Sequence, residues 1–235
     1  MNLLLIEPGE LVAADEAVIT GRRVTHVREV IKAQSGDVLR AGVVDGLMGS
    51  AEILESSETR LHLRISLAEA PPDPLPVTLL LALPRPKMLK RIFQTIATMG
   101  VKRLVLLNSY RVEKSYWDSP WLKPEAIREQ LITGLEQGRD TVVPQVILEP
   151  RFKPFVEDRL PELMQGSRGL IAHPVAAVEC PRALRGSVTL AIGPEGGFIP
   201  YEIEQFTLQG FEAVSLGPRI LRVETAVSAL LARLF

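Results

Sequence analysis

Residues 77–100 read VTLLLALPRPKMLKRIFQTIATMG, and this stretch predicts one strand followed by one helix. The run Val77–Leu83 is apolar, as expected for a strand that is buried on both faces of a parallel sheet. Pro84 and Pro86 follow this run. A helix tolerates proline only in its first turn, so the two prolines predict the start of a helix here. The helix is then predicted by an apolar stripe that ends at a glycine: Leu89, Ile92, Phe93, Ile96 and Gly100.

The same unit of strand and helix recurs toward the C-terminus. Further strands are expected at Val101–Leu107, Val142–Leu148, Gly169–Ala172, Val188–Ile192 and Ala213–Leu216. One helix is expected to open at Pro124, with Ile127, Leu131 and Leu135 on one face and Gly138 after its end. Further helices are expected over Pro154–Met164, Pro200–Leu208 and Val223–Leu234. Strands that alternate with helices predict an α/β fold with a largely parallel sheet.

The proline-rich segment PPDPLP, residues 71–76, is incompatible with a helix or a central strand and predicts a linker. It separates residues 1–70 from the α/β region at residues 77–235. Residues 1–70 are expected to form a small β-rich domain, with short strands at Val38–Val44, Ser50–Leu54 and Arg60–Leu67. One helix is expected there from the spacing of Val24, Val27, Val30 and Ile31, ending at Ser35-Gly36-Asp37.

The bulk composition is that of a soluble globular protein. The chain has 235 residues, 46% of them hydrophobic and 23% charged. No apolar segment approaches the roughly 20 residues that cross a bilayer, and the start of the chain lacks a secretory signal pattern, so we expect a cytoplasmic protein without a membrane role. Cys180 is the only cysteine and has no clustered metal-ligand partners, so we expect neither a disulfide nor a metal site.

The formal net charge of -1 provides no overall attraction to nucleic acid, so an RNA partner would have to be met by local basic patches. Two such patches are present. One comprises Arg22, Arg23, Arg28 and Lys32, and the other comprises Arg85, Lys87, Lys90 and Arg91. Composition alone leaves two interpretations open, which are phosphate-binding surfaces and solvated helix faces.

Two loops follow predicted strands at the end of the sheet where open α/β proteins usually bind ligands. The first is IGPEGGF, residues 192–198, and the second is LGPRILRVETA, residues 216–226. The three glycines of the first loop allow close approach of main-chain N–H and C=O groups to a flat ligand such as adenine. Neither loop has the spacing of a phosphate-binding loop, which disfavours an ATP or dinucleotide site.

Each loop also has an interpretation without a ligand. A GPEGG string fits a tight turn between a strand and a helix. Glu224 could act only as a favourable charge near the start of the last helix, where the helix dipole makes it worth about 0.3–1 kcal/mol.

The strings AIGPEGGF (Ala191–Phe198) and LGPRILRVETA (Leu216–Ala226) resemble the two signature loops of RsmE-type methyltransferases of the SPOUT superfamily. The resemblance implies an α/β domain with a trefoil knot that binds S-adenosylmethionine, an N-terminal PUA-like β-barrel that helps to hold RNA, and a homodimer. It also implies methylation of a uridine ring nitrogen, N3, in 16S ribosomal RNA of the small subunit.

The resemblance implies roles for individual residues. Cofactor contacts are implied for Leu83, Ala172, His173, Ile192, Gly193, Pro194, Glu195, Gly196, Gly197, Leu216, Gly217, Ile220, Leu221, Arg222, Glu224, Thr225 and Ala226. RNA contacts are expected for Arg22, Arg23, His26, Arg28, Lys32 and Ser115.

Loss of the N3 proton spreads negative charge over the uracil carbonyl oxygens, which fixed cationic donors would stabilise. Arg222 is the first candidate for that role and Arg139 is the second. Glu195 is expected to act as the base or to orient Arg222.

Three other functions fit parts of the sequence. A related enzyme could methylate a ribose 2′-oxygen or another base, and mapping of the methylated position separates the two. A non-catalytic RNA-binding or ribosome-assembly protein would bind no S-adenosylmethionine. A nucleotide-phosphate enzyme is disfavoured because no phosphate loop is present.

Overall fold

The computed structural model describes all 235 residues, and these form two compact units. The first unit comprises Met1–Asp73 with Leu131–Val143, and the second comprises Pro74–Gln130 with Pro144–Phe235. Helix α3, Pro124–Gly138, is divided between them. The proline-rich residues 71–76 contain neither helix nor strand. The sequence pattern did not indicate that residues 131–143 belong with the N-terminal region.

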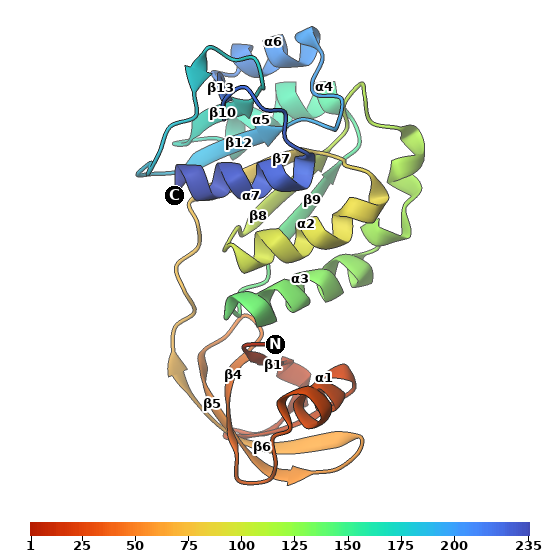
Figure 1. Cartoon of the computed structure of the whole chain (residues 1–235), viewed down its shortest axis with the longest axis vertical. Coiled ribbons are helices and arrows are strands. Elements are labelled where there is room, and N and C mark those ends of the chain that lie inside the picture. Colours follow the sequence, from red (N-terminus) through yellow and green to blue (C-terminus); the bar gives the residue numbers. More distant parts are fainter. The chain divides into compact units, whose positions relative to one another are not determined.

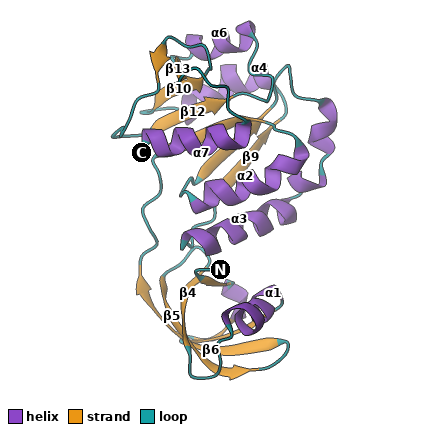
Figure 2. Cartoon of the chain, viewed as in Figure 1, coloured by secondary structure: helices purple, strands orange, loops and turns teal.

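The second unit is built on a sheet of seven strands, all of them parallel to their neighbours, in the order β11-β13-β10-β12-β7-β8-β9. Helices follow most of the strands along the chain (Figure 2). This confirms the predicted α/β class. The strands are β7 (Val77–Ala82), β8 (Arg103–Leu107), β9 (Gln145–Glu149), β10 (Arg168–Ala172), β11 (Val178–Glu179), β12 (Val188–Ile192) and β13 (Glu212–Ser215).

The helices of the second unit cover this sheet (Figure 1). They are α2 (Pro86–Thr98), α4 (Phe152–Pro154), α5 (Leu160–Leu163), α6 (Pro200–Leu208) and α7 (Val223–Leu234), with a π-helical turn at Phe155–Arg159 between α4 and α5. Helix α7 packs against α2 and against β12. None of the helices combines the length and apolar character needed to cross a lipid bilayer.

Three predicted elements have the bounds of the structure, and others are displaced by one to three residues: β8 begins at Arg103 instead of Val101, β13 spans Glu212–Ser215 instead of Ala213–Leu216, and the helix predicted at Pro154–Met164 begins at Phe152 and is interrupted by the π-helical turn. Val188–Ile192, Pro200–Leu208 and Val223–Leu234 coincide with β12, α6 and α7. Strand β9 begins at Gln145, three residues later than the predicted Val142. The reason is local, because the N–H groups of Val142 and Val143 donate to the carboxylates of Asp140 and Asp45, at 2.9 and 2.8 Å, instead of joining the sheet.

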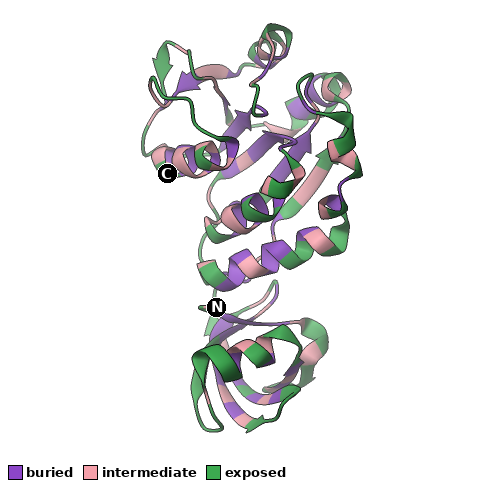
Figure 3. Cartoon of the chain, turned by 45° about the vertical axis from the view of Figure 1, so that its right-hand side comes forward, coloured by how far each residue is buried: buried purple, intermediate pink, exposed green.

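The core of the second unit is formed by its central strands and by one face of each long helix (Figure 3). Every residue of β12 is buried, as expected of a strand covered on both faces. The apolar stripe predicted on α2 is buried over its whole length, and α7 contributes Val223, Val227, Leu230, Leu231 and Leu234.

The first unit is built on a six-stranded sheet in the order β1-β4-β5-β6-β3-β2. Only β1 and β4 pair in parallel, and the remaining neighbours are antiparallel. The strands are β1 (Leu4–Ile6), β2 (Leu11–Ala13), β3 (Glu16–Thr20), β4 (Val38–Val43), β5 (Met48–Ser56) and β6 (Arg60–Glu69). The three strands predicted in residues 1–70 correspond to β4, β5 and β6, whereas β1, β2 and β3 were not predicted.

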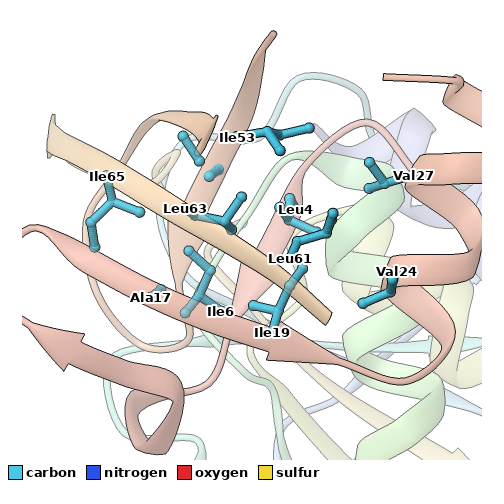
Figure 4. Close-up of a cluster of buried hydrophobic side chains, with 12 residues drawn as sticks. Leu4, Ile6, Ala17, Ile19, Val24, Val27, Ile53, Leu61, Leu63 and Ile65 are labelled. Carbon is cyan, nitrogen blue, oxygen red and sulfur yellow. The ribbon is translucent and has the colours of Figure 1, made fainter. Parts of the chain in front are cut away.

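The helix expected near residue 24 is present but only half of its apolar stripe is buried. Val24 and Val27 pack into the core of the first unit with Leu4, Ile6, Ile19 and other aliphatic side chains (Figure 4). Val30 and Ile31 are 66% and 40% exposed, so the expectation of one continuous apolar face was wrong. The physical reason is that helix α1 (Arg22–Thr25) widens into a π-helical turn at His26–Ile31, which breaks the spacing of 3.6 residues per turn.

Candidate functional site

The two glycine-bearing loops leave the same edge of the seven-stranded sheet. Residues 193–198 follow β12 and residues 216–222 follow β13, and both strands run parallel to β10, which lies between them. Because parallel strands have their carboxyl ends at one edge, the loops after β7 and β8 also begin there. Both signature loops therefore leave the sheet at the predicted end, although β10 lies between the two strands that precede them.

The first loop, residues 193–198, is a tight turn fixed at both ends. The N–H of Gly197 donates to the carbonyl of Pro194 at 2.7 Å, which closes the turn. Phe198 is 6% exposed, and its ring packs on that of Phe206 in α6 with centroids 5.3 Å apart. Glu195 and Gly196, between these anchors, are exposed. The loop thus presents its middle residues to solvent.

Glu195 is held by the exit loop of β7. Its carboxylate accepts a hydrogen bond from the main-chain N–H of Arg85 at 3.1 Å, and the Nε of Arg85 lies 4.0 Å from the same oxygen. The sequence left two roles open for Glu195, which are the base and a partner that orients Arg222. The structure gives it Arg85 as a partner instead, because β7 is the neighbour of β12 in the sheet whereas β13 lies two positions away on the other side.

The second loop, residues 216–222, is tied to the exit loop of β10. The N–H of Gly217 donates to the hydroxyl of Ser215 at 3.0 Å, and that hydroxyl lies 3.3 Å from the carbonyl of Pro174. The N–H of His173 donates to the carbonyl of Val214 at 2.9 Å. These bonds bring the predicted residues Ala172 and His173 beside the start of the second loop.

The rest of the second loop is open to solvent. Ile220 is 83% exposed and Leu221 is 36% exposed. Arg222 precedes the first residue of α7 and is exposed, while its carbonyl accepts the N–H of Ala226 at 2.8 Å. Glu224 lies in the first turn of α7, where its charge is favourable. The loop therefore offers apolar surface and a solvent-accessible guanidinium at one sheet edge.

The residues of this edge fit a flat nucleoside cofactor. Gly197 and Gly217 have φ angles of 73° and 109°, and no atom lies within 4 Å of the position that a Cβ would take at either residue. A ligand can therefore approach both main chains closely. Leu83 and Ile192 are only 0% and 3% exposed, so neither offers appreciable accessible surface at this edge, and their predicted contacts with a cofactor stay predictions.

Two residues of this edge were not predicted from the sequence. The guanidinium of Arg111, in the exit loop of β8, donates to the carbonyl of Gly196. Glu202 in α6 is 2% exposed and accepts hydrogen bonds from the hydroxyl of Ser109 and from the N–H of Tyr110. The only signal in the sequence is that Glu202 lies three residues after Ile199, a spacing typical of a helix-capping glutamate.

The predicted RNA-contacting residues of the first unit are not all free. Arg22 pairs with Glu136 at 2.9 Å, and the side chain of Glu136 is 3% exposed. The side chain of Arg23 is 15% exposed, lies 2.5 Å from the carboxylate of Glu10 and donates to the carbonyl of Leu5. Both arginines make contacts within the first unit, although the side chain of Arg22 is still 48% exposed. Arg28 and Lys32 are exposed and His26 is half-buried, and the RNA contacts of all five residues stay predictions.

Two further predicted residues lie outside the signature loops. Ser115 is exposed in a short 3-10 turn, Lys114–Asp118, of the second unit. Arg139 is exposed directly after α3, has a φ angle of 58° and belongs to the first unit. Their roles stay predictions.

Comparisons with known proteins show what the chain as a whole is similar to. Residues 71–235 match the family model of an RNA methyltransferase domain. Curated proteins named ribosomal RNA small subunit methyltransferase E are 32% identical in Treponema pallidum, over 97% of this chain and 88% of that protein, and 27% identical in Synechocystis, over 98% and 76%.

Solved structures have the same fold. A methyltransferase from Legionella pneumophila, in complex with S-adenosylmethionine, is 25% identical with a TM-score of 0.75, covering 98% of this chain and 94% of that one. A ribosomal RNA small subunit methyltransferase E from Neisseria gonorrhoeae is 20% identical with a TM-score of 0.74, covering 98% and 95%. With one family model over most of the chain and a relative matched along nearly its whole length, the chain belongs to the ribosomal RNA small subunit methyltransferase E family of RNA methyltransferases.

Proposed function

We propose that this chain methylates ring nitrogen N3 of a uridine in 16S ribosomal RNA of the small subunit, with S-adenosylmethionine as the methyl donor. Its family membership makes it a methyltransferase that uses S-adenosylmethionine and acts on RNA. The observation that carries the proposal is the sheet edge where the exit loops of β12 and β13 combine open glycine main chain, exposed Ile220 and the free guanidinium of Arg222.

The cofactor would be held mostly by main-chain groups and apolar side chains. Gly197 and Gly217 leave room for close approach, and Ile220 and Leu221 would cover the nucleoside. The same site would include Ala172, His173, Gly193, Pro194, Leu216, Thr225 and Ala226, which lie in or beside these loops. S-adenosylmethionine supplies a methyl group on a positively charged sulfur, and so no metal ion is needed for the transfer.

The chain's own residues would handle the charge of the acceptor. When N3 of uracil loses its proton, negative charge spreads to the two neighbouring carbonyl oxygens. Arg222 is exposed at the site, and its guanidinium would stabilise that charge. Glu195, held by Arg85, would accept the proton, and Arg139 is the second candidate for charge stabilisation.

RNA would be held by charges outside the cofactor loops. In the first unit the exposed cations Arg28 and Lys32, together with His26, would contact phosphates. In the second unit the exposed Lys87, Lys90 and Arg91 lie on α2, directly after Arg85. Ser115 would contact the RNA from the exit loop of β8.

We further propose the family's finer architecture for this chain. Residues 1–70 would be a PUA-like RNA-binding barrel, residues 71–76 a linker and residues 77–235 a SPOUT domain with a trefoil knot, acting as a homodimer in the cytoplasm. The knot is supported by contacts between the segment before β12 and the end of the chain, since the N–H groups of Ala183 and Leu184 donate to the carbonyls of Arg233 and Leu234. Supporting the barrel, the six-stranded sheet of the first unit encloses its own aliphatic core (Figure 4).

Primer extension on small-subunit RNA tests the proposed position. A methyl group on N3 removes a Watson–Crick donor, so reverse transcriptase should stop at the modified uridine in RNA from normal cells and read through it in RNA from a deletion strain. Methylation of purified small subunits by the protein should restore the stop. Methyl transfer to a ribose 2′-oxygen or to another base would refute the N3 assignment. Absence of S-adenosylmethionine binding in calorimetry would refute the enzyme itself.

A further inference from the structure

We infer that Arg111 and Glu202 are positioning residues for the S-adenosylmethionine-binding loop, residues 193–198. The inference rests on the proposed cofactor site. Neither side chain belongs to the signature loops, and both act through the exit loop of β8, residues 108–112.

Glu202 joins the exit loop of β8 to the end of the cofactor loop. One carboxylate oxygen accepts the N–H of Tyr110 at 2.7 Å. The other accepts the hydroxyl of Ser109 at 3.1 Å and the N–H of Ile199 at 3.0 Å. The residue is 2% exposed. A buried carboxylate is costly unless its oxygens are hydrogen-bonded, so these three donors have to stay in place together.

Arg111 extends this connection onto the cofactor loop itself. It follows Tyr110 directly, and its guanidinium donates to the carbonyl of Gly196. A Cβ at Gly196 would lie 2.8 Å from the Cδ of Arg111, so the aliphatic part of the arginine packs closely over the glycine. Position 196 therefore has to be glycine for as long as Arg111 occupies this place.

The cofactor loop is thus clamped by two neighbouring strands. Arg85, after β7, holds Glu195, and Arg111, after β8, holds Gly196. Strands β12, β7 and β8 are consecutive in the sheet. The carbonyl of Gly196 is thus held by the side chain of Arg111, 85 residues away in sequence, and the carboxylate of Glu195 by the main-chain N–H of Arg85, 110 residues away. Residues 195–197 present their main chain to the proposed cofactor between these two contacts.

Calorimetric titration of the full chain with S-adenosylmethionine tests the inference. We expect Arg111→Ala to weaken binding about tenfold, which is the effect of losing one hydrogen bond from a charged donor. Arg111→Lys should recover part of the affinity because lysine keeps one donor. Glu202→Gln should also weaken binding. The glutamine NH₂ group cannot accept a hydrogen bond, so either the N–H of Tyr110 or the other two donors would lose their acceptor. Arg103→Ala, at the opposite end of β8, and Glu204→Gln, exposed on α6, are matched controls that should bind like the wild type.

A double-mutant cycle separates positioning from a general loss of stability. Gly196→Ala alone should weaken binding because its Cβ displaces Arg111. The double variant Gly196→Ala/Arg111→Ala should bind no more weakly than the weaker of the two single variants, since both changes remove the same contact. Additive losses, or Arg111 and Glu202 variants that bind like the controls, would overturn the inference.

Failure of the proposed function and failure of the positioning role give different results. A wild-type chain that binds no S-adenosylmethionine contradicts the proposed function. A wild type that binds, with Arg111→Lys and Glu202→Gln variants of unchanged affinity, contradicts only the positioning role. If an alanine variant loses the circular dichroism spectrum of a folded chain, Arg111→Lys and Glu202→Gln, which both keep a polar side chain, decide whether the positioning role holds.

Discussion

Replacement of Phe206 by alanine should strongly destabilise the second unit. Phe206 is fully buried in α6, and its ring contacts three others, with centroids 5.5 Å from Phe152, 5.3 Å from Phe198 and 5.0 Å from Phe211. Removing a buried phenylalanine side chain costs about 3–5 kcal/mol through lost burial and the cavity that remains. That is a large share of the roughly 5–15 kcal/mol by which a typical domain is stable.

Urea unfolding followed by tryptophan fluorescence measures this effect in the second unit alone. Both tryptophans, Trp117 and Trp121, lie in that unit, and the indole N–H of Trp117 donates to the side-chain carbonyl of Asn108 at 3.0 Å. With a slope of about 1–3 kcal/mol per molar urea, the unfolding midpoint should fall by about 1–5 M. Leu208→Ala, on the same helix but 71% exposed, is the control and should change the free energy of unfolding by less than about 0.5 kcal/mol.

The same substitution should impair the cofactor site. Phe198 ends the cofactor loop and packs on Phe206, so the loop loses its anchor even where the variant remains folded. We expect weaker binding of S-adenosylmethionine at a temperature where circular dichroism shows a folded chain. A decrease of less than about 1 kcal/mol in the free energy of unfolding would show that this ring cluster contributes little to the stability of the second unit.

Four further outcomes are expected. Gly49→Ala should unfold the first unit, because its Cβ would lie 2.0 Å from the main-chain oxygen of Ser66 in the paired strand β6; retained circular dichroism and resistance to proteolysis would contradict this. Arg222→Ala should lower single-turnover methylation by about 100-fold at saturating cofactor, the usual loss for a donor to a developing oxyanion, and full turnover would exclude its electrostatic role. Replacing Arg28 and Lys32 by alanine should weaken binding to all RNA sequences and reduce the slope of log K against log salt by about 1.4–1.8, whereas an unchanged slope would remove them from the RNA surface. Burial raises the pKa of Cys180 above its usual value of 9.0, an effect that Arg233 only partly offsets, so the thiol should resist alkylation near pH 8 until the chain unfolds.

The raised pKa of Cys180 also makes the free energy of unfolding depend on pH. The folded state holds the Cys180 proton more tightly than the unfolded chain does. Its contribution to stability is therefore complete below the unfolded pKa and is lost as the pH rises through the higher folded pKa. Cys180→Ala should reduce the loss of stability measured between about pH 8 and pH 10.

Local patterns in the sequence were sufficient for the class of fold and for the position of the two glycine-bearing loops along the chain. The strand Val188–Ile192 and the helices Pro200–Leu208 and Val223–Leu234 were predicted with the bounds of the structure, because the apolar strand, the proline that opens the first helix and the apolar spacing of the second are visible in a few consecutive residues. The glycines within residues 193–197 predicted a loop whose main chain a ligand can approach closely. This prediction is also local, because the missing side chain of a glycine affects mainly its own backbone.

Other features were decided by the tertiary structure. The wrong prediction of a continuous apolar face through Val30 and Ile31 arose because periodicity does not reveal a π-helical turn. The basic residues Arg22 and Arg23 form part of a charged stretch in sequence, but their partners Glu136 and Glu10 are known only once the chain is folded.

The sequence alone determined that strands alternate with helices and that two glycine loops follow strands, because these properties depend on neighbours along the chain. Only the folded chain decided which strands are adjacent, and therefore which distant side chains hold those loops. Glu202 and Tyr110 are 92 residues apart, and Arg111 and Gly196 are 85 apart. Their contacts follow from the strand order β12-β7-β8, which is set by how the whole sheet buries its apolar surface and is not encoded in any single segment.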